Sequence, residues 1–166
     1  IVIMLSKENS YIYKKLYSNK NIDQILSDAS FIKKILLFES MLVKANYELK
    51  YLSYKAYKNI NKAIMSSKFD AEDLQHDLEY SGMVTINLLN QIKRKIDKNY
   101  IPFLHFGATS QDSIDTALIL QLKETRKLFL NNLKTISYKL FNLAVKNKKT
   151  YTAGRTRNKI ATLTTF

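Results

Sequence analysis

Two short segments of the sequence hold residue types that could bind a negatively charged small molecule. The first, His105 to Asp112, places the hydroxyls of Thr109 and Ser110 and the amide of Gln111 where an apolar helical pattern begins. Backbone N–H groups at a helix N-terminus have no helical acceptor, and beside hydroxyls they suit a carboxylate or phosphate. The same residues also suit a structural role, in which Gly107 makes the turn and Thr109 or Ser110 is the N-cap. Both interpretations stay open because capping and anion binding are compatible.

The second segment, Thr152 to Lys159, carries three cations within five residues, Arg155, Arg157 and Lys159, beside Gly154. Two arginines on a glycine turn suit fork-like recognition of carboxylates. The structural alternative is that cations gather near helix C-termini, where they offset the helix dipole, and that a glycine marks the helix end. Together the two segments indicate a protein that binds small polycarboxylates.

The element between these segments is predicted to be one long helix from Gln111 to Asn147. Apolar residues recur there at helical spacing, and neither Gly nor Pro interrupts the stretch before Gly154. At about 1.5 Å per residue the helix would be roughly 55 Å long, whereas a compact chain of this length should be only about 40 Å across. Apolar residues off the main stripe, such as Leu128 and Phe141, need partners on more than one side. We therefore expect other subunits, the rest of a longer polypeptide, or both, to cover this helix.

The remaining sequence also indicates helices, so the predicted fold class is all-α. From Phe31 to Leu52 the apolar residues follow alternating spacings of four and three, which is typical of a helix that buries one face. Residues 70–80 and 84–98 indicate two further helices on either side of Gly82. No stretch shows sustained strand alternation, so no sheet is expected.

The composition excludes several classes of function. The sequence has no Cys, which excludes thiolate chemistry and disulfides and favours a reducing, cytoplasmic location. It has two His far apart in the sequence, so no metal site is expected. No apolar run is long enough to span a bilayer. The net charge of +13 would attract polyanions, but the lysines are scattered over every segment, and neither nucleic acid nor a membrane is an expected partner.

Residues His105 to Leu122, HFGATSQDSIDTALILQL, resemble the first signature region of the fumarase/aspartase superfamily, in the form found in bacterial 3-carboxy-cis,cis-muconate cycloisomerases. The AGRT sequence at 153–156, with Ala161 and the later Thr-Thr-Phe at 164–166, is similar to the second signature. The resemblance implies a helical N-terminal domain at 1–104 and, at 105–166, the start of a central helical bundle. It also implies a homotetramer whose active sites each draw on several subunits.

The resemblance further implies chemistry on a small polycarboxylate substrate without a cofactor. Most members add or eliminate across a carbon–carbon bond next to a carboxylate and release fumarate, whereas the cycloisomerase branch closes 3-carboxymuconate into a lactone. In such chemistry a base handles a proton alpha to a carboxylate while donors hold the developing charge. By the same resemblance, six residues contact the substrate, the last three from another subunit: Thr109, Ser110, Gln111, Gly154, Arg155 and Thr156.

Several positions depart from the family pattern. In the lyases a histidine that takes part in proton transfer follows Gly-Arg-Thr, but here the residue is Arg157, whose guanidinium cannot act as an acid or base near neutral pH. The cycloisomerase branch lacks that histidine, so Arg157 favours it over adenylosuccinate lyase, the nearest alternative. Lys159 replaces the usual glutamine and Leu163 the usual proline. The third signature, a loop with the serine proposed as catalytic base, is not found, so the catalytic base is unknown.

Three hypotheses follow from these residues. The first is the N-terminal portion of a 3-carboxymuconate cycloisomerase-like enzyme, and the second is an adenylosuccinate lyase. The third is a truncated relative that no longer catalyses and serves as a helical interaction module. The first residue, Ile1, favours a fragment, and the chain alone is not expected to hold a complete active site. His105 is expected to be structural and His76 a surface residue.

Overall fold

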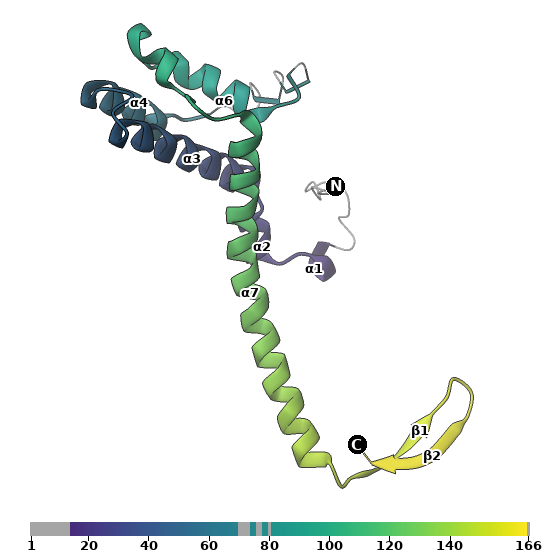
Figure 1. The fold of residues 1–166 in the computed structure, drawn as a ribbon. Coiled ribbons are helices and arrows are strands. Elements are labelled where there is room, and N and C mark those ends of the chain that lie inside the picture. The colour runs from purple at the N-terminus through teal and green to yellow at the C-terminus, as the bar shows by residue number, and fades with distance from the viewer. Residues whose placement is uncertain (1–13, 70–73, 76–77, 80, 166) are drawn as a thin grey trace. The chain divides into compact units, whose positions relative to one another are not determined.

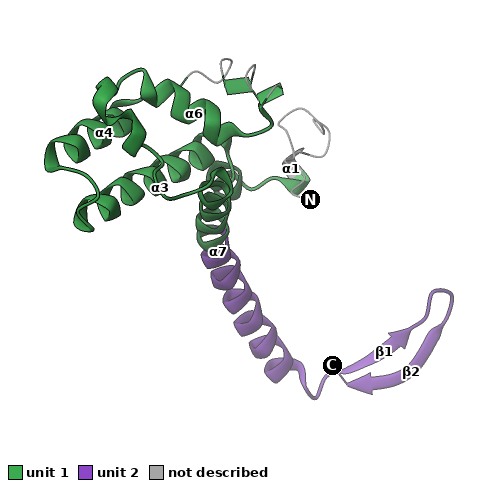
Figure 2. Cartoon of the chain, turned by 45° about the horizontal axis from the view of Figure 1, so that its top comes forward, with its two compact units in different colours: residues 1–124 green, residues 125–166 purple. Residues whose placement is uncertain are grey.

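The computed structural model describes residues 14–69, 74–75, 78–79 and 81–165 of the chain. These residues form helices and one two-stranded sheet, so the predicted all-α class is confirmed apart from a β-hairpin (Figure 1). The chain divides into two compact units, the first ending at Glu124 and the second beginning at Thr125 (Figure 2). The domain boundary expected between residues 104 and 105 stays a prediction.

Local capping signals set the bounds of the helices in the first unit. Ser27 and Ser53 accept hydrogen bonds from backbone N–H groups at the starts of helices α3 and α4, which is the usual role of an N-cap serine. After helix α3, Lys50 has a φ of 65°, a left-handed conformation that ends helices. The described elements before the long helix are α1 (Lys14–Tyr17), α2 (Lys20–Ile25), α3 (Asp28–Glu48), α4 (Tyr54–Ser66), α6 (Val84–Lys93) and the 3-10 helix η1 (Lys98–Phe103).

Helix α3 confirms the helix predicted from Phe31 onward, but its buried face coincides with the predicted stripe only in part, at Ile35. Leu49, which belongs to the predicted stripe, lies beyond the helix and is 66% exposed. The face that is buried is partly polar and consists of Ile35, Glu39, Ser40, Val43 and Asn46. The polar members of this face approach the turn that precedes the long helix, as described below.

Two hydrophobic clusters hold the first unit together. Each fully buried aliphatic side chain in them stabilises the fold by roughly 1.5–3 kcal/mol relative to exposure. The larger cluster joins helices α3, α4 and α6 through Val43, Ile60, Ala63, Ile64, Leu89 and Ile92. The smaller cluster consists of Ile35, Leu74, Leu88 and Ala117. Because Ala117 belongs to the long helix, the first turns of that helix are part of this core.

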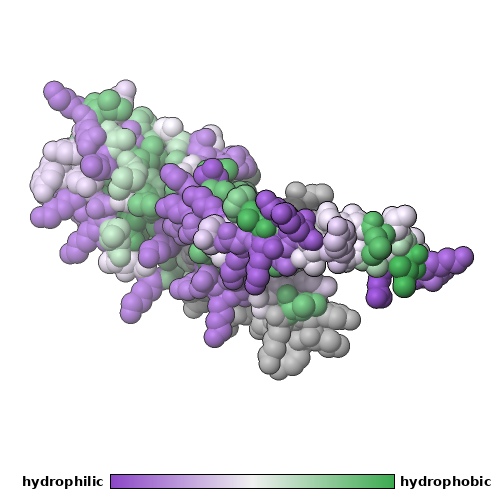
Figure 3. Space-filling model, turned by 90° about the horizontal axis from the view of Figure 1, so that it is seen from below, coloured by the Kyte–Doolittle hydropathy of each residue, from purple (hydrophilic) through white to green (hydrophobic). Residues whose placement is uncertain are grey.

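Helix α7 (Ser110–Asn147) has 38 residues and confirms the long helix predicted from Gln111 to Asn147. At about 1.5 Å per residue it is roughly 57 Å long. Figure 3 shows hydrophobic side chains that reach the surface among hydrophilic ones. On α7 within the second unit the large exposed hydrophobic residues are Phe129, Leu130, Leu133, Ile136, Tyr138, Leu140, Phe141, Leu143 and Val145. The expectation that other chains or segments cover this helix stays a prediction.

The second unit also contains a β-hairpin, which contradicts the prediction that the chain has no strand. Strand β1 (Tyr151–Arg155) pairs antiparallel with strand β2 (Ile160–Thr165). Gly154 was predicted to make the turn, but it lies within β1, and the turn runs from Thr156 to Lys159, where the Thr156 N–H donates to the Lys159 carbonyl at 2.9 Å. Almost every strand residue is exposed, so neither face supplies the apolar alternation that identifies a strand in a sequence.

The two helices predicted on either side of Gly82 are only partly tested. Residues 74–75 and 78–79 are helical, whereas the rest of the predicted span at 70–80, which includes His76, lies outside the described residues. The helix predicted at 84–98 is shorter than expected, since α6 ends at Lys93 and η1, which contains Pro102, follows. Gly82 lies just before α6 with a φ of 64°.

Candidate functional site

The turn before helix α7 has a left-handed backbone at two positions. Gly107 has a φ of 83°, which confirms its predicted role as the turn residue. His105 has a φ of 61°, which is uncommon for a residue with a side chain. A left-handed histidine needs contacts that hold it in place, and the surrounding helices provide them.

His105 is held by a buried carboxylate of helix α3. Its Nδ1 atom lies 2.7 Å from Oε1 of Glu39, whose side chain is almost wholly buried. The other two polar atoms of the pair, Glu39 Oε2 and His105 Nε2, are buried without a hydrogen-bond partner among the described residues. Burial raises the pKa of the Glu39 carboxyl above its ordinary value, and the nearby His105 opposes that shift. The structural role expected for His105 is therefore supported by its contacts.

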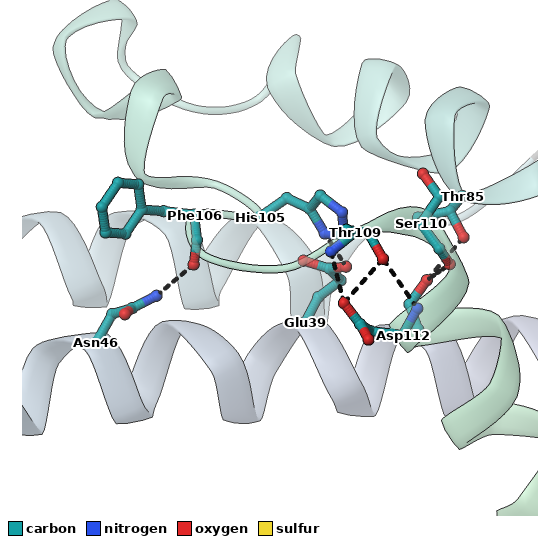
Figure 4. A network of polar contacts seen from close by, with 9 residues as sticks. Glu39, Asn46, Thr85, His105, Phe106, Thr109, Ser110 and Asp112 are labelled. Carbon is teal, nitrogen blue, oxygen red and sulfur yellow. Dashed lines mark hydrogen bonds and ion pairs between the residues drawn. The ribbon is translucent and has the colours of Figure 1, made fainter.

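Three further polar contacts hold the segment that follows His105 (Figure 4). The side-chain amide of Asn46 donates to the carbonyl of Phe106 at 2.9 Å. The hydroxyls of Thr85 and Ser113 are 2.8 Å apart and buried, and Ser113 donates to the carbonyl of Ser110 at 2.8 Å. Helices α3 and α6 thus fix the backbone that leads into helix α7.

Thr109 and Asp112 form a reciprocal cap at the start of helix α7. The backbone N–H and the hydroxyl of Thr109 donate to Oδ2 of Asp112 at 2.7 and 2.9 Å (Figure 4). In return the Asp112 N–H lies 3.4 Å from the Thr109 hydroxyl oxygen. The bond from the Thr109 N–H, and then that from its hydroxyl, lowers the pKa of the Asp112 carboxyl below its usual range. Thr109 is therefore the capping residue of the two candidates.

Ser110 and Gln111 begin helix α7, where backbone N–H groups lack helical acceptors. Ser110 is partly exposed, and its hydroxyl has no hydrogen-bond partner within the described residues. Gln111 is exposed, and its amide donates to Oδ1 of Asp115 at 2.7 Å. Ser110 therefore offers the hydroxyl that is not already used by the fold, while Thr109 and Gln111 make local contacts. The substrate contacts predicted for these three residues stay predictions.

The other predicted site residues belong to the hairpin of the second unit. Gly154 lies on β1, where an added Cβ would lie 3.2 Å from the Thr162 carbonyl oxygen, so a side chain there would require the paired strand to shift by a few tenths of an ångström. The Thr156 hydroxyl donates to the Lys159 carbonyl at 3.0 Å and so stabilises the turn. Arg155 and Arg157 are exposed and have no ion-pair partner within the described residues. The structure thus groups the six predicted residues into one set on each unit.

Sequence reasoning missed Glu39, Asn46, Thr85 and Ser113 as parts of the site. The one signal available was that polar residues occupy positions 39 and 46 on the same helical stripe as buried Val43, where apolar residues would be expected. Among the residues that the structure describes, no group of three or more His, Cys, Asp or Glu could hold a metal ion. No described helix is long and apolar enough to cross a membrane.

Comparison with known proteins places this helical fold in one family. A family described as Lyase matches residues 8–166, which is most of the chain. The chain therefore belongs to this lyase family, which is part of the fumarase/aspartase superfamily. The resemblance seen in the two signature segments is confirmed.

Three relatives show how widely this family ranges. N-acetyl-S-(2-succino)cysteine lyase of Enterococcus italicus is 31% identical over 90% of this chain and 33% of its own length. Adenylosuccinate lyase of Methanocaldococcus jannaschii is 27% identical over 90% of this chain and 32% of its own length. The solved 3-carboxy-cis,cis-muconate lactonizing enzyme from Pseudomonas putida has a TM-score of 0.83 at 27% identity, covering 95% of this chain and 36% of that one. The chain spans about a third of the length of these relatives.

Proposed function

We propose that this chain is the N-terminal portion of a 3-carboxy-cis,cis-muconate cycloisomerase-like enzyme. The observation that carries the proposal is Arg157 in the position that holds a proton-transferring histidine in the lyases. A guanidinium stays charged near neutral pH and can bind a carboxylate in a forked contact, but it cannot exchange protons. The likeness to the Pseudomonas putida lactonizing enzyme, at 27% identity over 95% of the chain, supports the same choice.

The proposed reaction is an intramolecular addition to a carbon–carbon double bond. A carboxylate oxygen of the substrate forms a C–O bond to one alkene carbon, and the electron pair of the double bond moves toward the carboxylate conjugated with the other carbon. That carbon then takes up a proton from an acid, and the lactone results without any cofactor. Charge builds on the conjugated carboxylate before the proton arrives, so donors aimed at it accelerate the reaction.

Ser110 is the residue best placed in the first unit to provide such a donor. Its hydroxyl has no other partner within the described residues, and it begins a helix whose N-terminal end favours anions. The Glu39–His105 pair and the Asn46–Phe106 bond hold the preceding turn, so the helix start is preorganised. In this proposal Thr109 positions the helix start, and Gly154, Arg155 and Thr156 line the site from another subunit.

The first experiment mixes the purified chain separately with 3-carboxy-cis,cis-muconate, adenylosuccinate and N-acetyl-S-(2-succino)cysteine. Loss of diene absorbance measures turnover of the first, and fumarate release measures turnover of the other two. Muconate turnover that disappears in Ser110→Ala but persists in the matched exposed variant Thr116→Ala supports the proposal. Turnover of either succinyl compound with no loss of diene absorbance contradicts it.

The second candidate function is an adenylosuccinate lyase-type enzyme, which the Methanocaldococcus jannaschii relative favours. A melting-temperature shift separates the candidates even if the chain alone does not turn over substrate, because a ligand that binds only the folded state raises the melting temperature. An adenine nucleotide should raise it in the wild type but not in Ser110→Ala if the chain is a lyase of this type, whereas under the main proposal the tricarboxylate is the compound whose shift depends on Ser110. No shift with any of these compounds favours the non-catalytic relative.

We also propose that the chain works as a homo-oligomer in the cytoplasm. The oligomer is supported by the hydrophobic side chains exposed along α7 in the second unit, such as Phe129 and Ile136, at 54% and 52% exposure. Exposed apolar groups arranged along a helix mark a surface for another chain. Light scattering after size-exclusion chromatography tests this directly, and a monomeric mass at every concentration contradicts it.

A further inference from the structure

The first unit has a concavity that the proposed function does not use. It has a volume of about 420 Å³ and lies between the end of helix α3, the start of helix α4 and the 3-10 helix η1. Its wall includes four tyrosines, Tyr47, Tyr51, Tyr54 and Tyr100, together with Lys50 and Asn99. Pockets that hold a single small organic ligand have volumes of roughly 300–1,000 Å³.

Tyrosines are concentrated at this pocket. Of the 11 tyrosines in the sequence, four line it, and a fifth, Tyr57, contacts two of these four. The rings of Tyr47 and Tyr57 are nearly parallel, with centroids 5.1 Å apart, and Tyr54 contacts both. Part of the pocket wall is thus formed by aromatic rings in mutual contact, and such rings pack favourably against another flat aromatic ring.

The polar groups of the pocket are available for a ligand. No phenol hydroxyl of the four lining tyrosines, nor the amide of Asn99, has a hydrogen-bond partner within the described residues. Tyr51 and Tyr54 are 60% and 59% exposed, so the rings face an open space and not a core.

The charge at the pocket is positive. Lys50 is the charged side chain among the described lining residues, and it has no ion-pair partner within the described part of the chain. The nearest acidic residues along the chain are engaged elsewhere, Glu48 with Lys44 at 3.7 Å and Asp97 with Asn59 at 3.0 Å. A cation held at the rim of an aromatic wall favours a ligand that combines a flat ring with a negative charge.

We propose that this pocket binds a planar aromatic ring that carries an anionic group, such as an aromatic carboxylate or a nucleotide. The ring packs against Tyr47, Tyr54 and Tyr100, and the anion pairs with Lys50. The site is separate from Ser110 and does not depend on the proposed reaction. It nevertheless adjoins the turn before helix α7, because the ring of Tyr51 contacts that of Phe106 at a centroid distance of 6.0 Å. A bound ligand would therefore be separated by one layer of side chains from the turn before helix α7, whose backbone is held in place by the contacts of Asn46 and His105.

The test uses the ¹⁹F NMR line of 4-fluorobenzoate in the presence of the full chain. Saturable broadening is expected, and unlabelled benzoate should reverse it. Cyclohexanecarboxylate has the same charge without a flat ring, and 4-fluorobenzamide has the ring without the charge, so both should bind more weakly. Displacement by AMP or by 4-hydroxybenzoate supports the proposed ligand class. AMP stands for a nucleotide and 4-hydroxybenzoate for an aromatic carboxylate, so the compound that displaces the probe identifies the kind of ligand. No broadening, displacement by neither compound, or equal displacement by cyclohexanecarboxylate overturns the proposal.

Matched variants assign the binding to this pocket. Tyr54→Leu removes a half-exposed ring and should weaken binding by between about twofold and tenfold. Lys50→Gln removes the charge and should weaken it by about two- to fivefold. Tyr151→Leu and Lys62→Gln change an exposed tyrosine and an exposed lysine elsewhere and should bind like the wild type, as should Ser110→Ala. If Ser110→Ala abolishes binding and Tyr54→Leu does not, the benzoate occupies the proposed substrate site and the pocket proposal is wrong.

Discussion

Oε1 of Glu39 lies 2.7 Å from Nδ1 of His105, and this contact connects the middle of helix α3 to the turn before helix α7. The two residues are 66 positions apart in the sequence. A carboxylate that is buried with one oxygen unpaired is costly unless it neutralises or gains a partner. The pair therefore fixes the left-handed His105 while remaining sensitive to protonation.

The pH dependence of stability should change when Glu39 is replaced by Gln, which keeps an acceptor oxygen but cannot ionise. The folded pKa of Glu39 lies above its ordinary value of 4.5, chiefly because of burial. A carboxyl with a raised folded pKa contributes stability that is complete below the unfolded pKa and is lost as the pH rises through the folded pKa. The free energy of unfolding of the wild type, relative to Glu39→Gln, should therefore fall as the pH is raised above about 4.5.

Urea unfolding followed by circular dichroism at several pH values measures this difference. Glu48→Gln is the control, since Glu48 is an exposed residue of the same helix that pairs with Lys44. The free energy of unfolding of the wild type, relative to Glu48→Gln, should not fall in this way as the pH is raised. Parallel curves for the wild type and Glu39→Gln would mean that Glu39 does not titrate differently in the fold.

Thr109→Ala should destabilise the first unit by about 1 kcal/mol, the usual effect of losing a side-chain N-cap. Thr116→Ala changes an exposed threonine within the same helix and should be neutral or slightly stabilising, because Ala is the better helix former. The Asp112 pKa is lowered by its bonds to Thr109, so the stability it contributes is present at neutral pH and is lost on acidification. The difference in the free energy of unfolding between Thr109→Ala and the wild type should accordingly become smaller in acid. A difference that does not change with pH would argue against the Asp112 contact.

The buried hydroxyl pair of Thr85 and Ser113 should respond unequally to mutation. Because Ser113 donates to the Ser110 carbonyl, the Thr85 hydroxyl is the donor across the 2.8 Å contact. Ser113→Ala leaves that donor buried without an acceptor and should cost about 1–3 kcal/mol, whereas Thr85→Val leaves Ser113 bonded and should cost about 1 kcal/mol. The double variant should cost less than the sum of the two. Strict additivity in equilibrium unfolding would show that the two hydroxyls do not interact.

Gly107→Ala should destabilise the fold through its backbone alone. Nothing lies within 4 Å of the Cβ that a substitution would add, but the φ of 83° is unfavourable for a residue with a side chain. The expected cost is about 1 kcal/mol, and Gly107→Asn should cost less because Asn tolerates this region better. Thermal unfolding of both variants checks which one is less stable. A larger loss of stability for Gly107→Asn than for Gly107→Ala would indicate a steric effect instead.

The elements that the sequence predicted correctly are those with local causes. Helix α7 was predicted because its apolar spacing continues without Gly or Pro. The turn at Gly107, with Thr109 or Ser110 as the cap, was predicted because glycine and hydroxyl residues have specific backbone uses, and the structure selects Thr109. The hairpin was missed because its strands are exposed on both faces and its turn uses Thr156 in place of a glycine.

The parts of the candidate site that depend on distant contacts could not be predicted in this way. Helix α3 was placed correctly, but its buried face was predicted only in part, because Glu39 and Asn46 lie on that face and a hydrophobic pattern counts polar residues as exposed. Their burial is explained only by His105 and the Phe106 carbonyl, which are about sixty residues away in the sequence. Periodicity describes one helix at a time and carries no information on such partners.

The nearly complete exposure of the described residues after Thr125 has a consequence for how the protein is handled. The part of helix α7 beyond Thr125 fully buries no side chain against its own chain. It therefore gains little from folding alone, and its stability depends on the solution conditions. Its helix content, its rate of amide exchange and its tendency to precipitate should all vary with protein concentration and with whatever second surface is supplied. Dilution and co-expression are therefore the conditions that decide how residues 125–147 behave.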